Sequence, residues 1–278
     1  MTVLAGGTNR DESAPSNGAA APGVVHNQSV LKAVALIGCF VDSAEGKTLT
    51  ELARHTGMNV STAYRMLQTL TLTGVLRRND GEERYFVGPM LLALAGSTFS
   101  SNGYGIALDV LRALSEETGE SASLGIRDGD CVVVLLSSGS SQQLRFMHRA
   151  GERIPIHCSA MGKALLASRG INLAQAVAGL GRLHPMTPHS ICRTDVLLAE
   201  LERIRQTGHA VEEEESHLGV RSLAMIAAGG DTARIAVGVQ GPVSRMSAER
   251  MEFLLELLRN ATNLVAKLPI MERLGTSG

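Results

Sequence analysis

Apolar residues between positions 48 and 72 recur at the three- and four-residue steps that two short helices require. The first series contains Leu49, Leu52 and Ala53 and stops at Gly57, which suits the left-handed conformation that ends a helix. The second series follows Asn59 and Ser61, both good helix caps, and puts these apolar residues on one face: Ala63, Met66, Leu67 and Leu70. Two short helices around a glycine-containing turn predict a helix-turn-helix.

The opposite face of the second predicted helix is polar. We expect five of its residues to contact DNA in a major groove: Ser61, Thr62, Tyr64, Arg65 and Gln68. The sequence has no Asp or Glu between Glu51 and Asp80, and a surface without carboxylates suits a polyanion. The same periodicity would also fit a helical hairpin buried in the core of a larger domain, and this alternative stays open here.

A β-hairpin is predicted directly after the two helices. Two β-rich runs, 75–78 and 84–87, flank Asn79-Asp80-Gly81, and an Asp-Gly pair between such runs is a strong hairpin signal. A helix-turn-helix followed by a hairpin is a winged helix, and a helix capped by Ser29 is expected to pack behind it. We expect the wing to direct three cations towards DNA phosphates: Arg77, Arg78 and Arg84.

The remainder of the chain predicts a second domain of the α+β class, because antiparallel hairpins alternate with amphipathic helices. Helices are expected at 106–118, 160–167, 173–180, 194–208 and from Ser247 onwards. Strands are expected at 121–127, 131–137, 144–148, 211–215, 221–228 and 233–240, the last pair turning at 229–231. The predicted organisation is a disordered tail (1–25), a winged helix-turn-helix DNA-binding domain (26–88), a linker helix (89–103) and an effector-binding domain (104–270).

Composition restricts the class of protein further. The 278 residues carry a net charge of -1, so a nucleic-acid footprint has to be local. No run approaches the roughly 20 apolar residues that span a bilayer, and the start of the chain lacks a signal-peptide pattern. The four cysteines are widely spaced, and His184, His189 and Cys192 match no zinc pattern. We therefore expect a cytoplasmic protein with no membrane partner, metal or other cofactor.

Five sequence motifs occur in a fixed order. They are NQSVLKAV, STAYRMLQTL, YFVGPMLLAL, IPIHCSAMGKALLA and the pair GHAVEEEESHLGVRSLA and AVGVQGP. Across residues 27–267 the chain resembles the IclR family of bacterial transcriptional regulators. The resemblance implies a winged helix joined by a linker helix to a GAF-like effector-binding domain. It also implies a homodimer or homotetramer, a palindromic double-stranded DNA operator, and repression or activation controlled by a small organic acid.

The resemblance also places an effector site, on these residues: Ala160, Met161, Glu212, Ser222, Gly238 and Gln240. In the family, backbone amides at the first two positions hold a carboxylate, which agrees with the affinity of helix N-termini for anions. Lys163 either assists these amides or stays in solvent. Gly238 and Gln240 replace small hydroxyl residues, which suggests a pocket enlarged beyond the size of glyoxylate, and Met225 stands where the family usually has proline.

Two other functions compete with a ligand-responsive regulator. One is a small-molecule hydrolase with an incidental helix-turn-helix, and the other is an architectural DNA-binding protein that senses nothing. An enzyme needs a nucleophile and a base within reach. Neither the carboxylate run 212–215 nor the pair His157-Cys158 is expected to supply them, because neighbouring side chains of a strand point to opposite faces. We therefore expect no enzymatic activity.

Overall fold

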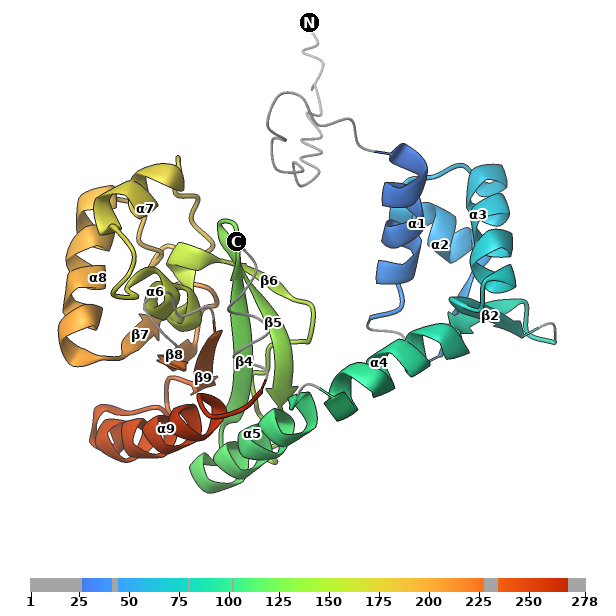
Figure 1. Ribbon diagram of the computed structural model, residues 1–278. Coiled ribbons are helices and arrows are strands. Elements are labelled where there is room, and N and C mark those ends of the chain that lie inside the picture. Colours follow the sequence, from blue (N-terminus) through green and yellow to red (C-terminus); the bar gives the residue numbers. More distant parts are fainter. Residues whose placement is uncertain (1–26, 42–44, 80, 102, 228–234, 270–278) are drawn as a thin grey trace, which may run out of the picture. The chain divides into compact units, whose positions relative to one another are not determined.

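The computed structural model describes residues 27–41, 45–79, 81–101, 103–227 and 235–269 (Figure 1). The chain divides into two compact units, and the boundary along the sequence lies between Val87 and Gly88. The predicted disordered tail, 1–25, and the predicted turn at 229–231 lie outside the described residues. Within them, no helix is both long and apolar enough to cross a membrane.

The first unit is a winged helix-turn-helix. Its described elements are α1 (Gln28–Gly38), β1 (Lys47–Thr48), α2 (Leu49–Thr56), α3 (Val60–Leu72), β2 (Leu76–Asn79) and β3 (Arg84–Val87). The three strands form an antiparallel sheet in the order β1-β3-β2. Leu36, Leu52, Leu67, Leu76 and Tyr85 form the core, so each of these helices contributes at least one leucine to a shared apolar centre.

Local capping sets the ends of the two helices of the motif. Thr48 and Glu51 form a capping box at the start of α2, and Gly57 ends the helix with φ of 65°. The Asn59 side chain accepts a hydrogen bond from the Thr62 amide and caps α3, as predicted. The prediction of Ser61 as a cap is wrong because α3 already begins at Val60, and Asn27 rather than Ser29 caps α1.

The second unit is an α+β domain built on an antiparallel sheet in the order β6-β5-β4-β9-β8-β7. Its described strands are β4 (Ser121–Asp128), β5 (Cys131–Ser138), β6 (Arg153–Pro155), β7 (Ala210–Glu213), β8 (Val220–Ala227) and β9 (Ile235–Pro242). Its described α-helices are α4 (Pro89–Ser101), α5 (Tyr104–Thr118), α6 (Ala160–Leu166), α7 (Leu173–Gly179), α8 (Thr194–Thr207) and α9 (Met251–Val265). Short 3-10 helices span Ile156–Cys158 and Ala248–Arg250.

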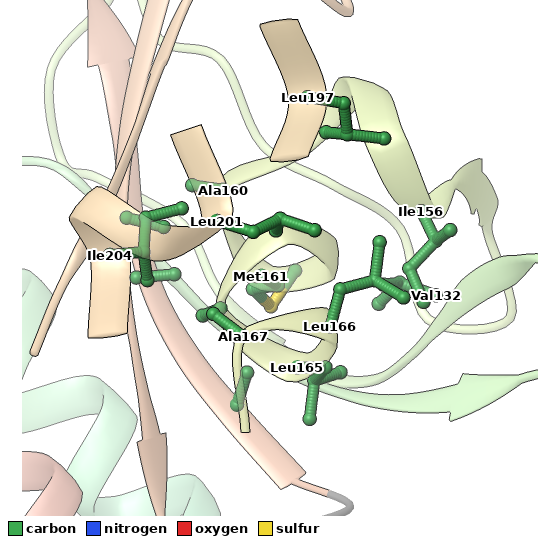
Figure 2. Packing of buried hydrophobic residues seen from close by; sticks show 14 of the residues in the cluster. Val132, Ile156, Ala160, Met161, Leu165, Leu166, Ala167, Leu197, Leu201 and Ile204 are labelled. Atoms are coloured by element: carbon green, nitrogen blue, oxygen red, sulfur yellow. The ribbon is translucent and has the colours of Figure 1, made fainter. Parts of the chain in front are cut away.

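Helices cover both faces of this sheet. Apolar residues of α5 and α9 pack with one set of strand residues, including Leu124, Leu223 and Val237. Residues of α6, α7 and α8 pack with the alternate set, including Val134 and Ala224. Figure 2 shows the part of this core that contains Leu165 of α6 and Leu201 of α8. The sheet therefore has two apolar cores, and α6 lies against the face that also carries the predicted effector residues.

One predicted strand is wrong. Residues 144–148 form no ladder, and the edge strand is instead β6, which pairs with β5. The side chains of this segment pack with other rings instead. The centre of the Phe146 ring lies 4.9 Å from that of His148 and 4.7 Å from that of His217. Arg245 Nη1 also donates to the Leu144 carbonyl oxygen at 2.9 Å. These contacts replace strand pairing in holding the segment.

Candidate DNA-binding and effector sites

The polar face of α3 is open to solvent. Ala63, Leu67 and Leu70 are buried against the rest of the winged unit, while Thr62 is half-buried. The other predicted contact residues are exposed: Ser61, Tyr64, Arg65 and Gln68. Gln68 Nε2 donates to the Tyr64 hydroxyl at 2.8 Å, which orients both polar groups. A hairpin buried in a larger core would have no such face, so that alternative is excluded.

The arginines of the wing are held by neighbouring side chains and backbone. The Arg77 guanidinium lies 4.5 Å from the centre of the Phe86 ring, and that of Arg78 lies 5.8 Å from the Tyr85 ring. Arg84 Nη1 donates to the Gly46 carbonyl oxygen at 3.1 Å. One donor group of Arg84 is therefore bonded to the turn before α2. Arg77 packs on the Phe86 ring and is exposed to solvent.

A row of polar side chains crosses the α6-facing side of the second sheet. The strand register pairs Glu212 with Ser222, Ser222 with Gln240, and Gln240 with Ser121. Directly paired residues share a face, and all four side chains are buried. Three of the predicted effector residues thus lie beside one another, with Gly238 in the adjacent row opposite Ser123.

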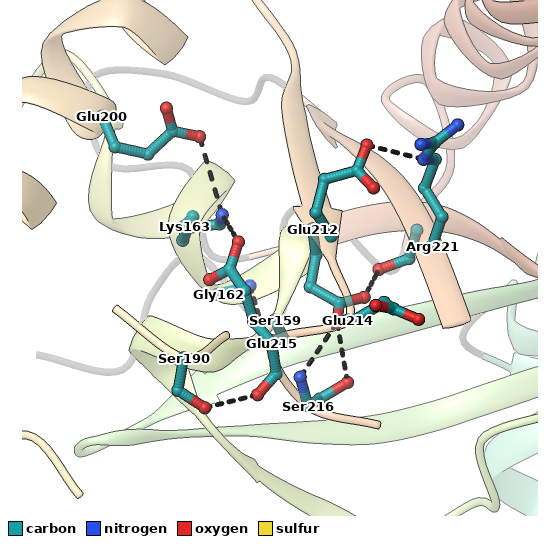
Figure 3. Close-up of polar contacts among 12 residues, drawn as sticks. Ser159, Gly162, Lys163, Ser190, Glu200, Glu212, Glu214, Glu215, Ser216 and Arg221 are labelled. Carbon is teal, nitrogen blue, oxygen red and sulfur yellow. Dashed lines mark hydrogen bonds and ion pairs between the residues drawn. The ribbon is translucent and has the colours of Figure 1, made fainter. Parts of the chain in front are cut away.

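The carboxylate of Glu212 is the most heavily bonded group of this row. It accepts hydrogen bonds from the Ser222 hydroxyl at 2.6 Å, the Ser216 amide at 2.9 Å and the Ser216 hydroxyl at 3.2 Å (Figure 3). Further along the sheet, Gln240 Nε2 donates to the Ser123 hydroxyl at 2.6 Å. Glu212 and Gln240 are therefore both fixed by neighbouring hydroxyl groups.

Helix α6 begins beside this row. Ser159 caps it by accepting a hydrogen bond from the Gly162 amide at 3.0 Å. A Cβ atom at Gly162 would lie 2.0 Å from the Ile156 carbonyl oxygen, so only glycine permits this tight entry. The amides of Ala160 and Met161 belong to the first turn, which helical bonding leaves without internal acceptors.

The Met161 side chain fills the space next to Gly238. A Cβ atom at Gly238 would lie 3.1 Å from Met161 Cγ, and one at Gly125 would lie 3.2 Å from Met161 Sδ. In this structure the Met161 side chain therefore occupies the space that the missing Cβ of Gly238 leaves open, and enlargement of a ligand pocket by Gly238 stays a prediction.

Comparison with known proteins identifies the family to which the chain belongs. The model described as the IclR helix-turn-helix domain matches residues 29–80, and the model described as bacterial transcriptional regulator IclR C-terminal matches residues 104–267. The chain belongs to the IclR family of bacterial transcriptional regulators. The winged helix-turn-helix and the α+β domain predicted from the sequence are those of the family.

Regulators of known name extend this likeness over most of the chain. The regulator BhcR of Paracoccus denitrificans is 34% identical over 213 residues, which cover 75% of each chain. The transcriptional repressor IclR of Escherichia coli is 29% identical over 240 residues, covering 84% of this chain and 86% of the repressor. Both relatives are named as regulators of transcription.

Solved structures agree in fold. A putative transcriptional regulator from a Rhodococcus species superposes with a TM-score of 0.71 at 27% identity, covering 90% of this chain and all of that one. An IclR homologue from Microbacterium hydrocarbonoxydans, solved in complex with 4-hydroxybenzoate, has the same TM-score at 20% identity with the same coverage. The second likeness concerns the fold alone.

Within this IclR-family domain, Lys163 neither assists the α6 amides nor stays in solvent. The side chain is 1% exposed, and its ammonium group contacts the Glu215 carboxylate and lies 3.6 Å from Glu200 Oε1 (Figure 3). Burial raises the pKa of Glu215, and the charge of Lys163 only partly offsets this. Burial acts in the same direction on Glu200, but hydrogen bonds from Arg203 and the charge of Lys163 lower its pKa overall. Lys163 thus links α6 to α8 and to the segment after β7.

The residue pairs considered for catalysis are placed differently from the prediction. Strand β7 ends at Glu213 and Glu214 has φ of 55°, so the alternation of the carboxylate run stops there. His157 and Cys158 lie in a 3-10 helix rather than a strand, and burial raises the pKa of the Cys158 thiol to about 11. A thiol with that pKa stays protonated near neutral pH. Among the described residues, no group of three or more His, Cys, Asp or Glu side chains is placed to hold a metal ion.

Several polar residues of the site were not predicted. Ser121, Ser123 and Ser216 all bond to, or lie in register with, the predicted effector residues. The serines at 121 and 123 sit two apart in a predicted strand, so their common face was visible in the sequence. Ser216 reaches Glu212 through the turn after β7, and strand alternation does not predict contacts made across such a turn.

Proposed function

We propose that this IclR-family regulator binds a palindromic operator as a homodimer or homotetramer in the cytoplasm, and that a small organic acid controls this binding. The observation that carries the DNA-binding part is the open polar face of α3 in a segment without carboxylates between Glu51 and Asp80. Such a face presents donors, acceptors and a fixed cation to base edges.

Each copy contributes one recognition helix. Ser61, Thr62, Tyr64, Arg65 and Gln68 face the bases, while the wing residues Arg77, Arg78 and Arg84 approach phosphates. Two copies place their α3 helices in major grooves about one helical turn apart, so a two-fold protein requires a palindromic site. Arg84 bonds to the Gly46 carbonyl oxygen and its Nη1 lies 4.0 Å from Glu51 Oε2, so we expect it to contribute less to phosphate binding than the exposed Arg77.

The effector site we propose lies between the start of α6 and the polar row of the sheet. The amides of Ala160 and Met161 receive the carboxylate of the acid, and Glu212, Ser222, Gly238 and Gln240 border the rest of the molecule. Like charges repel, so the carboxylate of the ligand faces α6 rather than Glu212. The Microbacterium homologue, which has the same fold, was solved in complex with 4-hydroxybenzoate, an organic acid.

DNA binding is tested by fluorescence anisotropy with the DNA upstream of the protein's own gene. Arg65→Ala should weaken specific binding by about 1–3 kcal/mol if Arg65 contacts a base. Arg112→Ala removes an exposed arginine of α5 and serves as the control. Unchanged affinity of the Arg65 variant at moderate salt would exclude Arg65 as a reader of sequence.

The effector is sought by thermal denaturation with a panel of aromatic and aliphatic carboxylates. A ligand that binds only the folded protein raises the melting temperature by mass action, by an amount that grows with concentration. The same ligand must then change the affinity for DNA. A carboxylate that stabilises the protein without any effect on DNA binding would contradict its role as effector.

A further inference from the structure

A groove of about 460 Å³ separates α1 from α3 in the winged unit. Its walls include Ser29 and Lys32 of α1 and Thr62, Arg65 and Thr69 of α3. Ala33, Met66 and Leu70 supply apolar surface between these polar walls. The groove is distinct from the wing and from the effector residues.

The charged side chains among the described residues that line this groove are both cations. Lys32 and Arg65 both line it, and its lining includes no Asp or Glu. Both side chains are exposed, and within the described part of the chain neither takes part in an ion pair. Two cations from different helices therefore face one concave surface whose described lining contains no carboxylate.

The groove is continuous with the reading face of α3. Thr62 and Arg65 belong both to its wall and to the polar face proposed to contact bases. A duplex lying against that face brings its sugar-phosphate backbone past the edge where Lys32 and Ser29 stand. Apolar surface suits the deoxyribose, and the cations suit the phosphate.

We propose that this groove binds the sugar-phosphate backbone of operator DNA, with Lys32 and the Ser29 hydroxyl contacting a phosphate next to the major groove that α3 reads. The inference rests on the proposed DNA-binding function and adds α1 to the interface. A phosphate contact carries no sequence information, so these residues strengthen binding to every duplex to the same degree.

Two variants test the contact without knowledge of the operator. A fluorescein-labelled mixed-sequence duplex, long enough for two half-sites, is titrated at several salt concentrations. Lys32→Ala should lower the slope of log affinity against log salt by about 1 for each bound chain. Lys32→Arg should restore the slope. Lys267→Ala removes one exposed lysine of the second unit and should leave the slope unchanged.

Ser29→Asp separates DNA contact from folding. Ser29 lies in the first turn of α1, where a carboxylate is favoured by the helix dipole, so the melting temperature should not fall. The carboxylate would nevertheless repel a phosphate in the groove, and DNA affinity should drop about tenfold near 0.1 M salt, the size expected for one counterion.

The outcomes distinguish the two proposals. If the unaltered protein binds no duplex at all, the proposed function fails. If it binds, and Arg77→Ala lowers the salt slope while Lys32→Ala and Ser29→Asp do not, the wing contacts phosphates but the groove does not, and only this inference is overturned. Equal losses for the mixed-sequence duplex and for the DNA upstream of the protein's own gene support it, whereas a loss confined to the upstream DNA contradicts a phosphate contact.

Discussion

A buried histidine joins the turn before α6 to the loop at residue 184. His157 Nε2 lies 3.1 Å from the His184 carbonyl oxygen. Burial lowers the pKa of His157, and the bond to the carbonyl only partly offsets this. The unfolded chain would protonate the same ring near pH 6.5. Because the unfolded state then binds more protons, stability rises with pH through this window and is lost as the pH falls below it.

His157→Gln should therefore flatten the dependence of stability on pH. Between about pH 7.5 and about pH 5.5, the free energy of unfolding of the second unit, measured by urea denaturation, should fall less for the variant than for the unaltered protein. Burial also lowers the pKa of His209, so the double variant with His209→Gln should be flatter still. Parallel profiles for all three proteins would show that neither ring is kept neutral by the fold.

The sequence names candidate effector residues, but it does not describe their surroundings. The family resemblance predicts Glu212 and Ser222 as members of one site, and the strand register of the structure pairs them directly. The sequence could not reveal that Met161 fills the space beside Gly238, because that contact joins two distant elements. It also could not reveal the burial of Lys163, since a lysine is buried this completely only when carboxylates of other segments reach it.

At the scale of elements, the turn of the helix-turn-helix depends on the backbone of one glycine. Gly57 has φ of 65°, and a Cβ atom there would meet nothing within 4 Å. Gly57→Ala therefore imposes backbone strain without a steric clash, and should lower the free energy of unfolding by about 1 kcal/mol. Gly38→Ala, at the end of α1 and without a positive φ, has the same open surroundings and should not destabilise. Chemical denaturation of both variants measures the difference, and equal effects would rule out strain at Gly57.

Helices and strands were predicted correctly where a short stretch of sequence determined them. The wing follows from the Asp-Gly pair between two β-rich runs, and α3 follows from its apolar spacing after Asn59. The predicted strand at 144–148 failed because its alternation serves ring packing by Phe146 and His148. Ile156–Cys158 became a 3-10 helix because the close approach of Gly162 to Ile156 requires a compact turn there.

The assembly of whole molecules is expected to involve α4. This helix exposes Met90, Leu92, Leu94 and Phe99, with Leu92 65% exposed. Its sequence carries no charged residue, and an exposed apolar surface of this kind is typical of a protein interface. Met90→Glu together with Leu94→Glu should shift the protein towards monomer in analytical ultracentrifugation and weaken binding to a two-half-site operator.

A matched double variant controls for added negative charge. Leu144→Glu with Leu218→Glu changes two leucines that are 72% and 63% exposed elsewhere in the second unit. It should keep the oligomeric state of the unaltered protein. An unchanged sedimentation coefficient for the α4 variant would place the interface between copies on another surface.

Regulation by an effector couples the two binding sites of the molecule, and such coupling is reciprocal. If the organic acid changes the affinity for operator DNA by some factor, saturating DNA must change the affinity for the acid by the same factor, about 5- to 150-fold in typical cases. Isothermal titration of the acid with and without operator, and anisotropy of DNA with and without acid, measure the two factors independently.

The variant Ser222→Ala tests whether the acid that is coupled to DNA binding lies beside Ser222. It removes the hydroxyl that donates to Glu212 at 2.6 Å and leaves a smaller side chain in the row. The variant should bind the acid more weakly but bind DNA with unchanged affinity when the acid is absent, because the winged unit is untouched. Since an effector shifts an equilibrium only by its differential affinity for the two states, more acid should then be needed for the same release or capture of DNA. A variant that responds at the original concentration would place the effector away from Glu212 and Ser222.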